Sequence, residues 1–292
     1  MNNSKDFRQR FVFDDLDVRG CVVSLQQTLE AIQATHHYPK NLSLVLNQFA
    51  LAATLLRDSI KIEGSLTIQL RTPGAIKLIM ADCLADRRVR AIAEHDQEQF
   101  AASDNLALDQ LGQGSILSIT ITPDDGERYQ SIVPIENASL EDCLADYFER
   151  SEQLPSSFKL FADLESGVGI ALHALPQQKV VDKSQSDEHF ARLTMLLQTL
   201  SKTEALALGS QELLSRLFHD ESCRLFDSSS VTFGCVCSAD KSLDAIKSLG
   251  QRDVEALITE HRSDGKSSLV VDCHFCFQRY EFEFTELDML FS

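Results

Sequence analysis

The chain has 292 residues, of which 43% are hydrophobic and 24% are charged, a composition typical of a soluble globular protein. Acidic residues outnumber basic ones by 44 to 27, so the formal net charge is −17, and no block of Lys and Arg stands out. Nucleic acids and anionic membrane surfaces are bound through clustered cations, so the sequence predicts neither kind of partner.

Eight cysteines occur in a chain whose first residues, MNNSKDFRQRF, lack the apolar core of a secretory signal. The longest apolar stretch, residues 42–56, is interrupted by Asn47 and Gln48 and fits a core helix better than a membrane span. We therefore expect a cytoplasmic protein in a reducing compartment. There, paired cysteines more often serve metal binding or redox chemistry than structural disulfides.

The chain begins with strand and helix patterns. Residues 10–25 predict strand material around a bend, and residues 24–35 and 41–60 predict two helices. Between the helices lies HHYP (36–39), whose proline ends the first of them. Residues 65–70, SLTIQL, alternate apolar and polar side chains, which predicts a half-buried strand.

A hairpin and a helix follow in the sequence. Residues 116–122 and 128–135 flank Asp-Asp-Gly (124–126), a hairpin signal. Residues 139–155 predict an amphipathic helix with Cys143 on its apolar face. Two further strands are expected at FKLFADL and GIALHAL. Together these patterns predict that residues 1–178 form one α+β domain with helices and a mostly antiparallel sheet.

Residues 179–230 predict a helical middle segment after a polar break. One apolar stripe comprises Phe190, Leu193, Leu196, Leu197 and Leu200. A second stripe comprises Leu213, Leu214, Leu217 and Phe218. This segment has no strands of its own, so we expect its apolar faces to be buried against another part of the chain.

The tail, residues 231–292, predicts a small third domain. Helices are expected at 242–249 and 253–260, and strands at 267–276 and 279–284. A segment of about sixty residues rarely has a core large enough to fold alone, so a disulfide or a metal ion is expected to stabilise it.

Four of the cysteines lie in this tail as two close pairs, Cys235 with Cys237 and Cys273 with Cys276. Residues i and i+2 of an extended chain point to one face, and Cys-x-x-Cys is the spacing of a metal-binding turn. Together the pairs predict a tetrahedral four-sulfur site suited to Zn²⁺, which can contribute roughly 10–16 kcal/mol to folding. The alternative is two unrelated pairs of buried cysteines.

Each pair is also close enough to form a disulfide, Cys235–Cys237 or Cys273–Cys276. Zinc-bound thiolates remain nucleophiles towards oxidants. Oxidation would remove all four ligands, release the ion and take away the stabilisation of the tail. The pattern therefore predicts a domain that an oxidant can unfold.

Over roughly residues 8–290, the chain resembles the redox-regulated 33 kDa chaperonins. The resemblance rests on HHYP (36–39), ITPDDGERYQ (121–130), DYFERSEQLP (146–155) and the Cys-x-Cys…Cys-x-x-Cys tail. It implies an ATP-independent holdase, not an enzyme, that binds unfolding client proteins in the bacterial cytoplasm. The family is inactive when reduced and zinc-bound, and peroxide or hypochlorite with unfolding stress activates it. One Zn²⁺ per chain on the four tail cysteines is implied, and a homodimer is a possible oxidised form.

Two features depart from the family pattern. The gap between the cysteine pairs, 35 residues, is a few residues longer than usual. Phe277 follows the second pair, where such turns commonly have Gly to relax the backbone. Both departures concern the tightness of the metal site.

The remaining candidate side chains favour simpler roles. Cys21, Cys83 and Cys143 are expected to be packed as small hydrophobic residues. Cys223 lies between the helical segment and the tail and is the one further candidate for redox chemistry. His274 lies between two predicted ligands and is expected to be a surface imidazole.

Two other functions compete with the chaperone. A thiol–disulfide oxidoreductase using Cys273 and Cys276 would need a thioredoxin-like βαβ context around the pair, and the sequence predicts a strand there. A zinc-ribbon nucleic-acid binder is opposed by the net charge of −17.

The hypothesis for activation is that zinc keeps the tail folded and the tail packs against the helical segment 186–220. That segment would lie on the sheet of the first domain. Loss of zinc would melt the tail and expose the stripe of Phe190, Leu193, Leu196, Leu197 and Leu200 as the client-binding surface.

Overall fold

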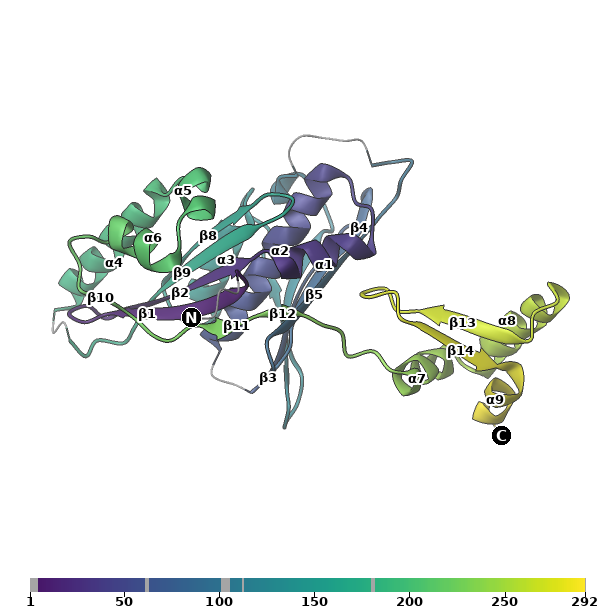
Figure 1. Ribbon diagram of the computed structural model, residues 1–292. Coiled ribbons are helices and arrows are strands. Elements are labelled where there is room, and N and C mark those ends of the chain that lie inside the picture. Colours follow the sequence, from purple (N-terminus) through teal and green to yellow (C-terminus); the bar gives the residue numbers. More distant parts are fainter. Residues whose placement is uncertain (1–4, 61–62, 101–105, 112, 180–181, 292) are drawn as a thin grey trace. The chain divides into compact units, whose positions relative to one another are not determined.

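The structure is a computed structural model that describes residues 5–60, 63–100, 106–111, 113–179 and 182–291 (Figure 1). The chain forms two compact units, Met1–Phe233 and Gly234–Ser292. The larger unit contains both the predicted first domain and the predicted helical segment. Each unit is described by itself.

The first sheet of the larger unit is antiparallel and has the strand order β10-β1-β2-β9-β8. Its strands are β1 (Phe7–Phe13), β2 (Val18–Leu25), β8 (Ser156–Ala162), β9 (Gly167–Ala174) and β10 (Cys223–Leu225). The short β11 (Ser229–Ser230) also pairs with β1. The strands predicted around the bend at residues 10–25, and those near 158–164 and 169–175, are confirmed.

The second sheet has the order β12-β5-β4-β3-β6-β7 and is antiparallel except where β12 runs parallel to β5. Its strands are β3 (Gly64–Arg71), β4 (Ile76–Cys83), β5 (Arg88–His95), β6 (Ile116–Pro123), β7 (Tyr129–Val133) and β12 (Thr232–Phe233). The predicted hairpin of β6 and β7 is confirmed. The sequence predicted one sheet and did not identify β4 or β5, which complete this second one.

Helix α2 (Lys40–Ser59) lies between the two sheets, and most of its residues are buried (Figure 1). Its polar interruption is part of the core: the Asn47 side chain donates to the Asp163 carbonyl at 2.8 Å and accepts from Gln33 Nε2 at 2.8 Å. Satisfied in this way, a buried amide costs little. No helix in the described ranges is both long and apolar enough to cross a membrane.

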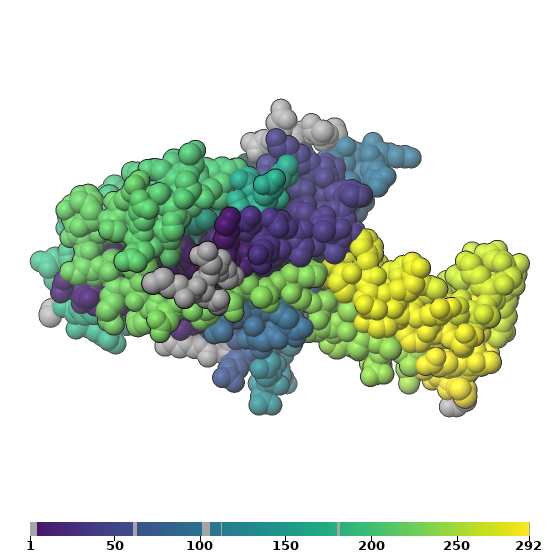
Figure 2. Space-filling model, in the orientation of Figure 1, coloured from purple at the N-terminus to yellow at the C-terminus, as the bar shows by residue number. Residues whose placement is uncertain are grey.

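The other helices of this unit complete its layers. They are α1 (Gln27–Thr35), α3 (Leu140–Ser151), α4 (Lys183–Thr199), α5 (Lys202–Ala207) and α6 (Ser210–Leu217), with a 3-10 turn at Leu108–Gln110. Helices α4 to α6 form a surface layer over the first sheet, on the face opposite α2 (Figures 1 and 2). The helices predicted for the middle segment are confirmed.

The apolar stripe of α4 faces that sheet. Leu193 and Leu197 are fully buried and Leu200 is 9% exposed, whereas Phe190 and Leu196 are only partly buried. They belong to one hydrophobic cluster with Phe11 and Phe13 of β1. The α4–α6 layer thus covers an apolar sheet face that would otherwise be in water.

Residues 223–233 join both sheets and end just before the first cysteine pair. β10 and β11 pair with β1, and two residues later β12 pairs with β5. Each of these ladders is two or three residues long. Short edge ladders open at low free-energy cost, so this segment, called the strap below, is among the more easily detached parts of the unit.

The smaller unit contains the two helices and two strands predicted for the tail, and it ends in a short helix that the sequence pattern did not predict. Its elements are α7 (Ala239–Leu249), α8 (Gln251–Ser263), β13 (Ser268–Asp272), β14 (Arg279–Glu283), α9 (Phe284–Asp288) and a 3-10 turn, Met289–Phe291. Its small core comprises Ile246, Val254, Ile258, Leu269, Phe282, Phe284 and Leu287.

Candidate metal centre

The sulfur atoms of Cys235, Cys237, Cys273 and Cys276 all lie within 4.8 Å of one another. Across the two pairs, Cys235 Sγ is 3.7 Å from Cys273 Sγ, and Cys237 Sγ is 3.5 Å from Cys276 Sγ. A tetrahedron with Zn–S bonds of about 2.3 Å has sulfur–sulfur edges of about 3.8 Å. The four sulfurs therefore have the spacing that one tetrahedral metal ion requires.

The second cysteine pair lies in the hairpin loop between β13 and β14. Asp272 and Arg279 are the last paired residues of the two strands before the loop. The Arg279 guanidinium donates to both carboxylate oxygens of Asp272, at 2.8 and 3.0 Å. Within the loop, Cys273 N–H donates to the Gln278 carbonyl at 2.9 Å, and Phe277 N–H donates to the Cys273 carbonyl at 2.8 Å. These bonds fold residues 273–278 so that both sulfurs point to one side.

Phe277 has a left-handed backbone, with φ of +55°. Its side chain is about half exposed, so no burial of the ring offsets the strain. A non-glycine residue pays roughly 1–2 kcal/mol for this conformation. The turn thus requires the left-handed backbone that Gly adopts readily, and Phe277 adopts it at a cost in free energy.

The first cysteine pair lies between β12 and α7. Ser238 is the N-cap of α7, accepting from Lys241 N–H at 3.2 Å, and the Lys241 ammonium donates to the Val236 carbonyl at 2.8 Å. The Tyr280 hydroxyl on β14 donates to Cys237 Sγ at 3.2 Å. No sequence pattern indicates this contact, because it joins residues 43 apart.

The four cysteines are partly buried thiols. Burial is the main cause that raises the pKa of Cys276 to about 12, and hydrogen bonds shared with the neighbouring thiols act in the same direction. Burial likewise raises the pKa of Cys273. Four thiols this close cannot all ionise unless a cation compensates their charge, and a soft divalent ion suits such a donor set.

The other candidate residues lie outside this cluster. Cys21, Cys83 and Cys143 are buried, as predicted. Cys223 is half-buried on β10 in the larger unit, where burial and then Asp14 raise the pKa of its thiol to about 11. His274 is exposed in the hairpin loop, and the ligand-type group found among the described residues consists of the four cysteines alone.

The loop position also bears on the oxidoreductase alternative. Cys273 and Cys276 lie between two antiparallel strands rather than at the start of a helix that follows a parallel strand. Thioredoxin-like chemistry depends on the latter arrangement, in which the helix N-terminus lowers a thiol pKa. The geometry therefore favours a metal-binding role for Cys273 and Cys276 over catalysis of thiol–disulfide exchange.

Comparison with a solved structure supports the fold. The crystal structure of the 33 kDa chaperonin from Thermotoga maritima superposes with a TM-score of 0.78 at 19% identity, covering 98% of each chain. The two chains therefore share the fold.

Curated relatives and a family model identify the chain more closely. It is 42% identical over 287 residues to the 33 kDa chaperonin of Azotobacter vinelandii, covering 98% of this chain and 95% of that one. It is 38% identical, with the same coverage, to the 33 kDa chaperonin of Pseudomonas aeruginosa UCBPP-PA14. Residues 6–283 match the family described as Hsp33 protein. The chain therefore belongs to the Hsp33 family of 33 kDa chaperonins.

Proposed function

We propose that this protein is a redox-regulated, ATP-independent holdase that binds unfolding proteins under oxidative stress. In its reduced form, one Zn²⁺ per chain is held by Cys235, Cys237, Cys273 and Cys276. The observation that carries the proposal is the convergence of these four sulfurs within 4.8 Å in the smaller unit. Zinc bound there would cross-link residues 235–237, at the start of this unit, to the hairpin loop between β13 and β14.

Oxidation acts on the thiols themselves. Each pair of zinc-bound thiolates gives two electrons to one peroxide, which takes up two protons from the solvent and becomes two waters while one disulfide forms. Two peroxides therefore convert all four ligands and release the zinc ion. The disulfides are Cys235–Cys237 and Cys273–Cys276. Neither disulfide joins one cysteine pair to the other, so the connection between residues 235–237 and the hairpin is lost. The small hydrophobic core must then keep the unit folded without the metal.

The strap would carry this change to the client-binding surface. It ends at Phe233, two residues before Cys235, and its ladders to β1 and β5 are short. Once Cys235 and Cys237 are no longer tied to the hairpin through zinc, the strap can separate from both sheets. The α4–α6 layer precedes it directly in the chain and would then loosen. The exposed surface would include Phe190, Leu193, Leu196, Leu197, Leu200 and the sheet face beneath them.

The proposed activity is tested with a client enzyme that aggregates on heating, without ATP. Protein treated with peroxide at raised temperature should suppress aggregation, reduced protein should not, and re-reduction with zinc should restore the inactive state. A matched variant with Cys143 replaced by Ser should behave as wild type, because that thiol is buried in the larger unit. Equal suppression by reduced and oxidised wild type would refute redox regulation.

The two disulfides should form in a fixed order. The two-residue gap between Cys273 and Cys276 allows a less strained ring than the one-residue gap between Cys235 and Cys237. We expect Cys273–Cys276 to form first and Cys235–Cys237 to follow after the strap detaches, which heat promotes. Mass-spectrometric disulfide mapping during slow peroxide treatment at low and raised temperature measures the order. Complete Cys235–Cys237 with thiols still at 273 and 276 would contradict it.

Phe277 should weaken the metal centre through its backbone. Replacing Phe277 with Gly removes the left-handed strain, about 1 kcal/mol, and should tighten zinc binding about fivefold. Replacing it with Ala removes the same ring but keeps a β-carbon, so Phe277→Ala is the matched control and should bind like wild type. Competition with a chromogenic chelator measures both affinities. Equal affinities of the Gly and Ala variants would show that the backbone at 277 does not limit the site.

A further inference from the structure

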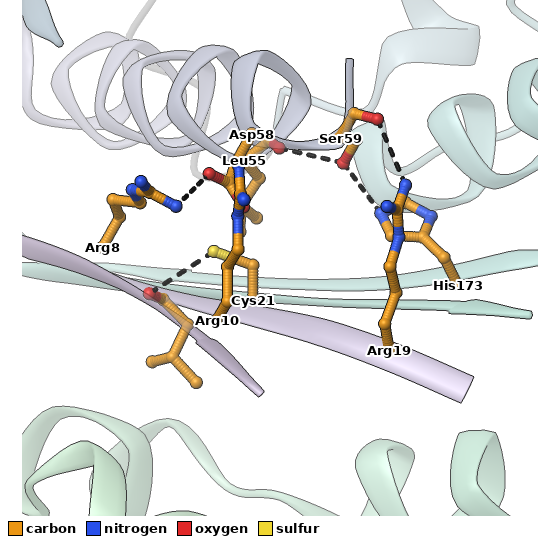
Figure 3. A network of polar contacts seen from close by, with 9 residues as sticks. Arg8, Arg10, Arg19, Cys21, Leu55, Asp58, Ser59 and His173 are labelled. Atoms are coloured by element: carbon orange, nitrogen blue, oxygen red, sulfur yellow. Dashed lines mark hydrogen bonds and ion pairs between the residues drawn. The ribbon is translucent and has the colours of Figure 1, made fainter. Parts of the chain in front are cut away.

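Five arginines, far apart in the sequence, meet in the larger unit of this acidic protein. Arg8 and Arg10 come from β1, Arg19 from β2, Arg57 from the last turn of α2, and Arg87 from the turn between β4 and β5. Figure 3 shows Arg8, Arg10 and Arg19 directed toward the end of α2. The net charge of −17 makes such a cationic cluster unexpected.

Two adjoining cavities lie among these arginines. The smaller has a volume of about 40 Å³ and is lined by Arg8, Arg10, Arg57 and Arg87, with Asp58. The larger is open, has a volume of about 730 Å³, and shares all of these residues except Arg8. One water needs a cavity of about 10–15 Å³, so the smaller cavity has room for a few waters or one small oxyanion.

The charges around the smaller cavity do not balance. Asp58 is the one carboxylate among the described residues that line it, and it is already bonded to Arg8 Nη1 and, at 2.7 Å, to Arg10 Nε. The carboxyl end of α2 adds roughly half a negative charge. Four guanidinium groups thus face about one and a half negative charges.

The larger cavity adds carboxylates from Glu63, Asp86 and Asp124. Asp86 is bonded to Arg88 at 2.7 Å, outside the cavity lining. His173 adds no positive charge, because burial and then the charge of Arg19 lower its pKa to about 3. The excess of positive charge is therefore concentrated at the smaller cavity.

Arg8 carries a donor that nothing in the described part of the chain accepts. The residue is 9% exposed, and its Nε is buried without a hydrogen-bond partner among the described residues. Leaving a buried charged donor unsatisfied destabilises the fold. Burial is also the leading cause that lowers the pKa of Arg8, and the charges of Arg87 and Arg10 act in the same direction.

Other arginines of the cluster are held in place by backbone carbonyls. Arg57 Nε donates to the Gly64 carbonyl at 2.7 Å, and Arg19 Nη2 donates to the Ser59 carbonyl at 3.2 Å. Fixed guanidinium groups present several N–H donors in a planar fork, the geometry that matches phosphate oxygens. The cluster is in this sense organised before any ligand arrives.

We propose that the smaller cavity binds a tetrahedral oxyanion of the phosphate class. The anion would accept hydrogen bonds from Arg8 and Arg87 and would balance the charge left by Asp58. It would join β1, the end of α2 and the β4–β5 turn, and so stabilise the larger unit. The source is either free inorganic phosphate or the phosphate group of a small ester, whose remaining atoms would occupy the larger cavity.

Calorimetry and thermal unfolding of the reduced, full-length protein test this proposal. The ligands are inorganic phosphate and glucose 6-phosphate, each compared with sodium chloride at equal ionic strength. Wild type should show saturable binding and a higher melting temperature with the anion. Equal affinity for both ligands identifies the free anion, and tighter binding of the ester shows that the larger cavity takes part.

Replacing Arg87 with Gln should weaken binding at least tenfold. Arg87 is on an exposed turn, so the variant should fold, and Arg87→Lys should restore part of the affinity. The matched control is Arg128→Gln, which removes an exposed arginine from the β6–β7 hairpin and should bind as wild type. No stabilisation of wild type beyond that in sodium chloride, or unchanged affinity in Arg87→Gln, would overturn the proposal.

Discussion

Removal of the metal is expected to unfold Gly234–Ser292 and to leave the two sheets of Met1–Phe233 and the helix between them folded. The core of the smaller unit comprises few large side chains, and a structural zinc site contributes roughly 10–16 kcal/mol of apparent folding free energy. Without this contribution the unit should lose α7, α8 and the hairpin. Metal analysis of reduced protein should find one zinc per chain. Chelation should abolish hydrogen-exchange protection in residues 239–288 and lower it in the strap and in α4 to α6, while β1 to β9 keep their protection.

The matching variant replaces all four tail cysteines with Ser. It should bind no zinc and should resemble the chelated wild type. The control is Cys223→Ser, which removes a half-buried thiol from β10 and should keep one zinc per chain. Freshly reduced wild type without zinc, or zinc retained by the four-serine variant, would contradict the assignment of the ligands.

Replacing Leu193 and Leu197 with Ser is expected to activate the chaperone without full oxidation. Both side chains are completely buried between α4 and the first sheet. Truncating a buried Leu costs about 2–5 kcal/mol, so the double variant should release the α4–α6 layer from the sheet while the core between the sheets stays intact. Suppression of client aggregation by the reduced variant, or with less oxidant than wild type needs, is the measurement.

The control for that experiment lies on the same helix. Met195 is 64% exposed, so Met195→Ser removes an apolar side chain without loosening the layer and should stay inactive when reduced. A double variant that remains inactive until fully oxidised would show that α4 is not the cover of the client-binding surface.

Much of the cysteine centre could be predicted because its information is local. The spacing of each pair aims two sulfurs in one direction, and the tail is too small to fold without stabilisation. The contact from Tyr280 to Cys237 and the arginine cluster could not be predicted in this way. Both join residues that only the tertiary fold brings together, and no periodic pattern marks them.

The second sheet was missed for a related reason. Ile76–Cys83 is buried on both faces over most of its length, so its apolar residues do not alternate. Arg88–His95 does alternate in part, with Val89, Ala91 and Ala93 buried, and that signal was available. The strap strands are too short to show any period. Helix α2 also indicated a second sheet, because a helix that is apolar on nearly all sides must be buried on more than one face.

Loss of the metal centre and gain of holdase activity are expected to be one event. The direct measurement treats reduced protein with limiting peroxide at raised temperature and follows zinc release, thiol content and suppression of client aggregation in the same samples. Suppression should rise in proportion to zinc released and reach its maximum at one zinc per chain. Full suppression while zinc is still bound, or complete zinc release without suppression, would contradict the account.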